Sequence, residues 1–212
     1  MMCRTWCKAQ TVFQCPEGCC VLVNLFGKYK TLVISIALFL LLDASVLAVN
    51  FYTSYQIALD AKTVNLAGRQ RMLSQRMVKA LFEVEKALAQ GVSPQPYLNE
   101  VAQAAQLFGQ TLTAFDLGGQ APGVQNDTVL LAALKPGAGR EALTEAKEIW
   151  LVYGQLIDQL LKQSTPEGIN RALPISMNYA RANNLTLLNL MNNLTLELER
   201  AASAKATQLR LI

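Results

Sequence analysis

The stretch Val64–Met77 reads V-N-L-A-G-R-Q-R-M-L-S-Q-R-M and decides the fold, because its apolar residues recur at helical spacing. At about 100° per residue, the apolar side chains of one side fall within roughly 60° of one another on a helical wheel. That stripe consists of Leu66, Leu73, Met77, Ala80 and Val84. A heptad-like stripe of this kind is typical of a helix packed into a bundle. We therefore expect an amphipathic helix that buries this face within its own chain.

Arginines are unusually dense in this helix, and the run contains no acidic residue. Arg69 and Arg76 border the apolar stripe, where long side chains can extend past the core into water. Arg71 lies on the opposite side, in a second stripe. The other members of that second stripe are Val64, Gly68, Gln75 and Val78. Small, apolar and amide residues around one arginine favour a second helix packed there, although periodicity alone also allows a solvated basic face in which Gly68 is incidental.

The second stripe suggests a contact between two copies of the chain. A two-fold axis through it would bring two Arg71 side chains face to face. Two guanidinium groups repel across a partly dry interface unless an anion lies between them, and a small planar oxyanion suits their forked donors. Asn65 and Gln75 are available as neutral donors nearby. Backbone N–H groups near Gly68 can contribute only where the helix is locally distorted.

Composition excludes several classes of function. The 212 residues carry a net charge of +4, but the basic residues are spread along the chain, so nucleic-acid binding is not indicated. Histidine is absent, which removes the commonest general base and the commonest metal ligand. All five cysteines lie in the first twenty residues, at spacings that match no metal site well. We predict no enzymatic activity, no metal and no cofactor.

Residues 1–30 contain these cysteines and have two alternative interpretations. They form a reduced cytoplasmic tail, or they result from a translation start placed upstream of a true start near Val21 or Val23. In either case, no residue from Val21 onward can form a disulfide within its own domain, because no cysteine follows.

A membrane-spanning helix is predicted over residues 31–49, because these 19 residues are apolar with one charge, Asp43. An acid near mid-membrane costs on the order of 3 kcal/mol, which the rest of the segment offsets. The basic residues that precede the segment are Arg4, Lys8, Lys28 and Lys30. This distribution predicts a cytoplasmic N-terminus and an exported remainder, which in a bacterium is periplasmic. No small-residue cleavage site follows, so the segment is expected to stay as an anchor.

The rest of the chain, residues 50–212, predicts an all-α fold: an antiparallel four-helix bundle after the transmembrane helix. The expected helices are 50–90, 97–115, 140–162 and 169–212, and residues 128–134 are expected to form one or two helical turns. Pro174 is expected in the first turns of the last helix. That helix is rich in asparagine, which indicates a polar face or hydrogen bonds between helices. The sequence shows one spanning segment and no second one. We therefore expect this chain to be the sensing part of a longer protein rather than a complete single-pass protein.

The run Ala61–Lys79 resembles a known signature. Its N-x-A-G-x-x-R-M-x-S/Q-x-R core resembles the periplasmic motif of the PilJ-type domain, the N-terminal domain of type IV pili methyl-accepting chemotaxis transducers. It is also similar to the motif of bacterial nitrate/nitrite sensor histidine kinases. Trp150 and the M-N-x-x-x-x-x-x-E run from Met191 to Glu199 fit the same family.

The resemblance implies a four-helix bundle that dimerises through its first helix and binds nitrate or nitrite at the dimer axis. It places the anion on Arg71, the arginine of the R-M pair, and places Gly68 at the site. Arg69 stands where the nitrate kinases typically have a small polar residue, and this extra cation would raise anion affinity or alter selectivity.

These inferences combine into one functional prediction. The chain is expected to be a homodimeric, membrane-anchored sensor domain of a bacterial signal transducer in the inner membrane. Its expected ligand is a small oxyanion, with nitrate or nitrite as the leading candidate. The expected site residues are Arg71, Gly68, Arg69, Asn65 and Gln75. The alternative is a ligand-free interaction module that pairs with another membrane protein. The output module, whether chemotaxis, kinase or cyclase, would lie beyond Ile212.

Overall fold

The computed structural model describes residues 29–124 and 127–210. The cysteine-containing tail predicted for residues 1–30 lies almost wholly outside the described residues. Contacts divide the chain into two units that meet between Thr53 and Ser54. The domain boundaries proposed from the sequence stay predictions.

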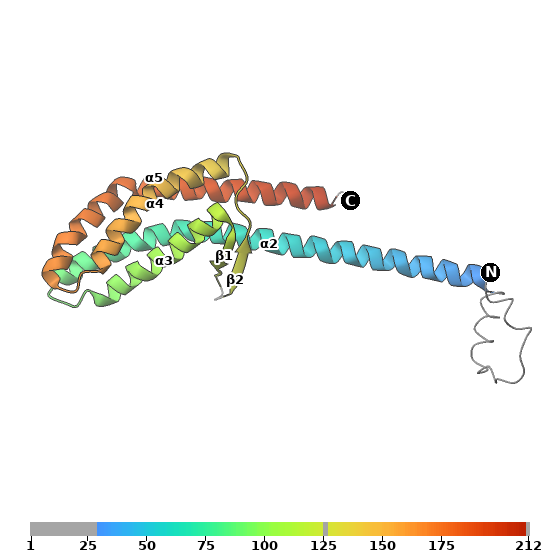
Figure 1. Cartoon of the computed structure of the whole chain (residues 1–212), viewed down its shortest axis with the longest axis horizontal. Helices are drawn as coiled ribbons and strands as arrows, with labels where there is room; N and C mark the ends of the chain where they lie inside the picture. The colour runs from blue at the N-terminus through green and yellow to red at the C-terminus, as the bar shows by residue number, and fades with distance from the viewer. Residues whose placement is uncertain (1–28, 125–126, 211–212) are drawn as a thin grey trace, which may run out of the picture. The chain divides into compact units, whose positions relative to one another are not determined.

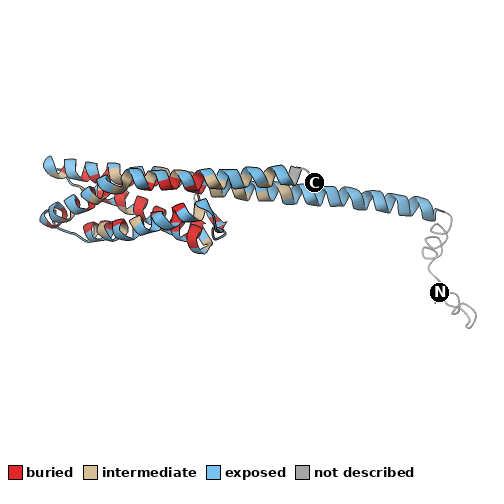
Figure 2. Cartoon of the chain, turned by 90° about the horizontal axis from the view of Figure 1, so that it is seen from above, coloured by how far each residue is buried: buried red, intermediate tan, exposed pale blue. Residues whose placement is uncertain are grey.

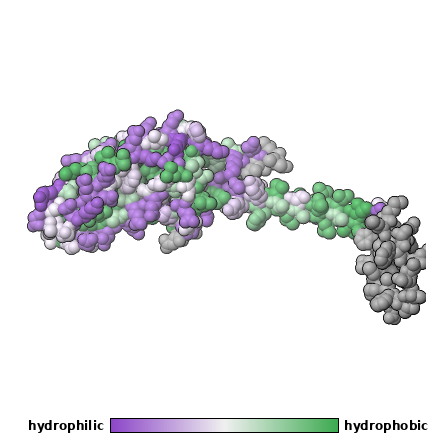
Figure 3. All heavy atoms as spheres, in the orientation of Figure 1, coloured by the Kyte–Doolittle hydropathy of each residue, from purple (hydrophilic) through white to green (hydrophobic). Residues whose placement is uncertain are grey.

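Helix α2 (Lys30–Ala89) runs for 60 residues without a break, so the expected spanning segment and first bundle helix are one helix (Figure 1). Its first part is apolar and exposed, as the burial and hydropathy colours in Figures 2 and 3 show. The most apolar window has a mean hydropathy of 2.6, and none of it is buried within the chain. By length and composition this part can cross a membrane.

The second unit is a helical bundle, which confirms the all-α prediction. Helices α3 (Gln95–Leu117), α4 (Ala138–Leu161) and α5 (Pro166–Arg210) pack with the later part of α2 around one apolar core (Figure 1). The five residues of the predicted α2 stripe are all buried. On α4 the side chains that face the core are Leu143, Ala146, Tyr153, Ile157 and Leu160. Trp150 is half-buried and lies against Phe108 at 4.7 Å between ring centroids.

The buried face of α2 is wider than the predicted stripe. It also includes Ala67, Gln70, Ser74 and Leu81. The reason is that α2 contacts helices on both sides: its side chains bond to Glu100 of α3 and to Asn192 of α5. A helix between two neighbours buries a broader face than the narrow seam of a two-stranded coiled coil.

A small β-hairpin replaces the helical turns expected at residues 128–134, and that prediction is wrong. Strand β1 (Gly119–Pro122) pairs antiparallel with β2 (Thr128–Leu131), with Ala121 opposite Val129. Side chains of β2 alternate, so that Val129 and Leu131 are buried while Thr128 and Leu130 are exposed. Four residues are too few for periodicity to separate a strand from a helical turn, so pairing with β1 decides the conformation.

Helix α5 begins earlier than expected, at Pro166 instead of about residue 169. The hydroxyl of Thr165 accepts a hydrogen bond from the Gly168 N–H at 3.1 Å, and proline suits the first helical position. Pro174 therefore lies inside the helix, about two turns after its start.

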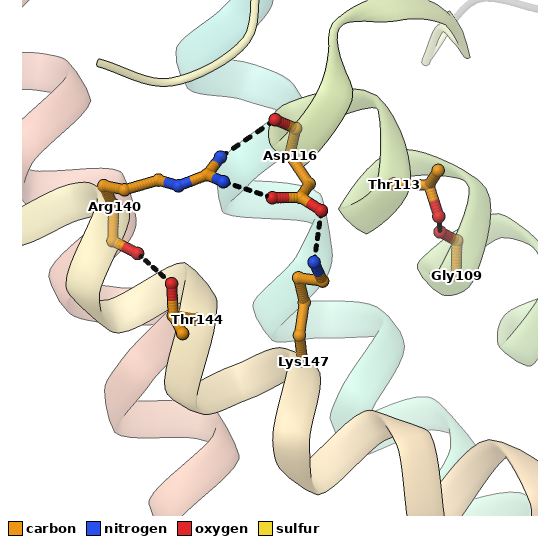
Figure 4. A network of polar contacts seen from close by, with 6 residues as sticks. All are labelled: Gly109, Thr113, Asp116, Arg140, Thr144 and Lys147. Atoms are coloured by element: carbon orange, nitrogen blue, oxygen red, sulfur yellow. Dashed lines mark hydrogen bonds and ion pairs between the residues drawn. The ribbon is translucent and has the colours of Figure 1, made fainter. Parts of the chain in front are cut away.

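An ion cluster joins the end of α3 to the start of α4 (Figure 4). The Asp116 carboxylate is only 8% exposed and meets Arg140 at 2.7 Å and also the Lys147 ammonium. Arg140 donates a further hydrogen bond to the Asp116 carbonyl at 2.8 Å. The hydrogen bond from Lys147 lowers the pKa of Asp116, against burial, which raises it, and Arg140 lowers it further. The cluster holds together the two helices that flank the hairpin.

Candidate functional site

The three arginines of the opening run have three different environments. Arg76 does not simply extend into water, as its place beside the stripe had suggested. Its Nε donates to Glu100 Oε1 of α3 at 2.7 Å, with both side chains about one-third exposed. The missing acidic partner is therefore supplied by a neighbouring helix, and the charge of Arg76 is neutralised within the chain.

Arg69 holds the hairpin instead of extending into water, so that expectation is also wrong. Its guanidinium donates to the carbonyls of Gly123 and Pro122, and more weakly to the Thr111 hydroxyl at 3.3 Å. Burial lowers the pKa of Arg69, and the Asp127 carboxylate offsets part of this effect. Lys62 pairs with the same Asp127 at 3.0 Å. Both cations tie α2 to the hairpin.

Arg71 lies at the edge of α2 that faces α5. Its Nη1 donates to Asn192 Oδ1 at 2.8 Å, and among the described residues it forms no ion pair with a carboxylate. The guanidinium lies over Gly68, with Nη2 3.7 Å from where a β-carbon on that glycine would stand. Gln75 donates to Asn184 of α5 at 2.7 Å. A second helix does pack against this stripe, and it is α5 of the same chain.

The predicted site residues therefore separate into two groups within one chain. Arg71, Gly68 and Gln75 share the α5 side of α2, and all three are at least partly exposed. Asn65 lies on the hairpin side, where it lines a cavity of about 170 Å³ with Lys62 and Asp127. Arg69 belongs to this second group, so one chain does not bring Arg69 or Asn65 together with Arg71.

A hollow of about 1080 Å³ lies between α2, α3 and the hairpin. Arg69, Arg76 and the amides of Gln103, Gln110 and Gln120 line it. The charges of both arginines already meet acceptors of the chain, so the hollow offers amide groups rather than a free cation. Within the described residues, no group of three or more Cys, Asp or Glu side chains is arranged to hold a metal ion.

Sequence reasoning did not single out Asn192 as a site residue. The asparagine-rich pattern of the last helix indicated hydrogen bonds between helices, and Asn184 and Asn192 both confirm it. The sequence signal for such contacts is the antiparallel arrangement expected of the first and last helices. Their relative register, however, cannot be read from either helix alone.

A family model matches residues 52–174, more than half of the chain, under the description "Type IV pili methyl-accepting chemotaxis transducer N-term", or PilJ. The chain belongs to this family. The match begins where α2 enters the bundle and ends in the early turns of α5, so it includes the arginine run. This PilJ chain is thus a sensor domain of the chemoreceptor type.

Among solved structures, the PilJ chain is similar to the ligand-binding domain of the P. aeruginosa nitrate receptor McpN. The two sequences are 21% identical, and the alignment covers 66% of this chain and 96% of that one, with a TM-score of 0.39. The search of curated proteins finds no match to this sequence.

Proposed function

We propose that this PilJ chain is the membrane-anchored input domain of a bacterial transducer, and that it binds a small planar oxyanion, nitrate or nitrite, between the Arg71 side chains of two copies. The sensing part would lie in the periplasm, with the apolar part of α2 as an inner-membrane anchor.

The environment of Arg71 is the observation that supports this site. Arg76 is neutralised by a carboxylate, and Arg69 is bound by carbonyls close to Asp127. Arg71 alone of the three meets only a neutral amide among its hydrogen-bond partners in the described residues, and it stays partly exposed. A partly desolvated cation without a counter-charge favours binding of an anion.

The geometry of Arg71 also suits a shared site. The guanidinium carries five N–H donors in a planar fork, and the one contact with Asn192 leaves others available. Two such forks related by a two-fold axis can hold the oxygens of one flat anion between them. Gly68 beside the fork adds no side chain that would obstruct the approach of a second copy.

Anion binding would act on the helices instead of performing chemistry. It would neutralise the two Arg71 charges, draw the α2 helices of the two copies together, and change the contact between α2 and α5 within each copy. The helices would have one arrangement with the anion bound and another without it. Only a difference in anion affinity between these two arrangements can drive a displacement along α2 towards the membrane.

The experiment is isothermal titration calorimetry of the full chain in lipid nanodiscs with the sodium salts of nitrate, nitrite, sulfate and chloride. We expect a binding heat for nitrate or nitrite that Arg71→Ala weakens at least tenfold. Arg181→Ala is the matched control, because Arg181 is exposed on α5 and packs over Phe82. No heat for any of the four salts would refute the proposal.

Two further outcomes point elsewhere. Unchanged nitrate binding in Arg71→Ala together with its loss in Arg76→Ala would move the site into the hollow between α2, α3 and the hairpin. Cysteine crosslinking at position 71 that is equally efficient with and without nitrate, in a chain that binds no anion, would favour the ligand-free interaction module.

A further inference from the structure

Asn192 is held at a defined position beside Arg71. It follows Met191 and precedes Leu194 by two residues, and both of these side chains are fully buried in the core. The Asn192 amide is itself half-buried, at the α2 edge of α5. Core packing on either side therefore limits how far the amide can move relative to the guanidinium.

The chemistry of the contact is specific in one respect. A guanidinium can only donate hydrogen bonds, so the Asn192 amide must turn its oxygen towards Arg71. The structure shows this orientation, with Arg71 Nη1 donating to Asn192 Oδ1 at 2.8 Å. A neutral acceptor fixes the direction of the fork without cancelling its charge. Glu100 does the opposite for Arg76, which it both orients and neutralises. Asparagine at position 192 thus keeps Arg71 both oriented and cationic.

We propose that Asn192 is a positioning residue of the anion site: it orients the Arg71 fork for an oxyanion and makes anion affinity depend on the place of α5. This inference rests on the proposed function. The anion would contact Arg71, while Asn192 acts through Arg71 and supplies the link between the bound anion and the last helix.

Three substitutions at position 192 separate this role from a merely structural one. Asn192→Asp keeps the size of the side chain but places a carboxylate against Arg71, so the resulting ion pair competes with the anion. Asn192→Gln changes the length of the side chain but keeps a neutral acceptor. Asn192→Leu removes the acceptor. If Asn192 has only a structural role, nitrate binding should tolerate aspartate best, because aspartate is closest in shape to asparagine. If Asn192 orients Arg71 as a neutral acceptor, nitrate binding should tolerate glutamine best.

A matched control is available at the next residue. Asn193 is exposed and faces α4, where it lines a cavity with Glu141 and Glu145. Asn193→Asp introduces the same charge one residue further along the same helix but on another face. Because Asn193 is exposed, salt screens a charge at this position more strongly than one at the half-buried position 192.

The test is calorimetric titration of sodium nitrate into the full chain in nanodiscs at physiological ionic strength, with the thermal midpoint of each variant recorded by circular dichroism. We expect nitrate affinity to fall more than tenfold in Asn192→Asp and about threefold to tenfold in Asn192→Leu. It should stay within about threefold of wild type in Asn192→Gln and within twofold in Asn193→Asp. Midpoints should stay close to wild type, since position 192 lies at the edge of the core.

The outcomes distinguish the inference from the proposed function. If wild type binds nitrate and Asn192→Asp binds it equally well, or better than Asn192→Gln does, the positioning role is overturned and the anion site stands. If wild type binds none of the four anions, the proposed function fails and the role of Asn192 fails with it.

Discussion

Replacing Asp116 with asparagine should destabilise the bundle, because this carboxylate connects α3 and α4. It is 8% exposed and holds two cations, Arg140 and Lys147, which are 35% and 43% exposed. The change replaces two hydrogen bonds between charged groups, worth about 1.5–3 kcal/mol each, with at most one weaker bond from a cation to a neutral amide oxygen. The half-exposed cations can return to water, so we expect a loss of about 2–3 kcal/mol, below the 3–5 kcal/mol typical of a fully buried pair.

The assay is thermal unfolding of the full chain in detergent micelles, followed by circular dichroism at 222 nm. For a bundle of this size, 1 kcal/mol corresponds to about 2–4 °C, so the midpoint should fall by roughly 4–12 °C. Asp158→Asn is the matched control, because Asp158 is exposed on α4, and a surface change of this kind is expected within about 0.5 kcal/mol.

The same comparison has a defined pH dependence. The pKa of Asp116 is lower in the folded chain than in the unfolded one, so its contribution to stability is present above the unfolded value of about 4. That contribution is lost as pH falls through the lowered folded pKa. The difference in midpoint between wild type and Asp116→Asn should therefore narrow from pH 6 towards pH 3. An equal midpoint at pH 7, or a constant difference down to pH 3, would refute the reasoning.

Two further predictions concern the core. Met77→Ala should lower the free energy of unfolding in urea by about 2–5 kcal/mol, because Met77 is fully buried. Met72→Ala, on the exposed side of α2, should lower it by under about 0.5 kcal/mol. Equal losses in the two variants would contradict the assignment of the buried face. Gly109→Ala should destabilise by about 1–2 kcal/mol, because its β-carbon would stand 3.1 Å from the indole Nε1 of Trp150. Gly154→Ala touches the same indole at an ordinary 3.4 Å and should be neutral or slightly stabilising, as an alanine in a helix normally is. Tryptophan fluorescence during unfolding measures the stability of both glycine variants. If Gly109→Ala is as stable as Gly154→Ala, the close packing of Gly109 against Trp150 is contradicted.

Local periodicity was sufficient to predict the four helices of the bundle and the central stripe of the buried face of α2. The α2 stripe from Leu66 to Val84 follows from apolar spacing, because an apolar stripe at helical period is buried against a neighbouring element. The apolar run at residues 31–49 likewise needs only length and composition to be identified as a candidate span. The arginine run was enough for the resemblance to PilJ domains, which the family match confirms.

Only the tertiary structure decided which partner each arginine has. The helical wheel separates Arg71 from Arg69 and Arg76 but identifies no partner for any of them. In the structure, Arg69 holds the hairpin, Arg71 meets an amide and Arg76 meets a carboxylate. Their partners lie between 24 and 121 residues away in the chain. Such contacts depend on the register between helices and on the strand pairing of residues 119–131. Register is set by how side chains of different helices interdigitate, and the period of a single helix carries no information about it.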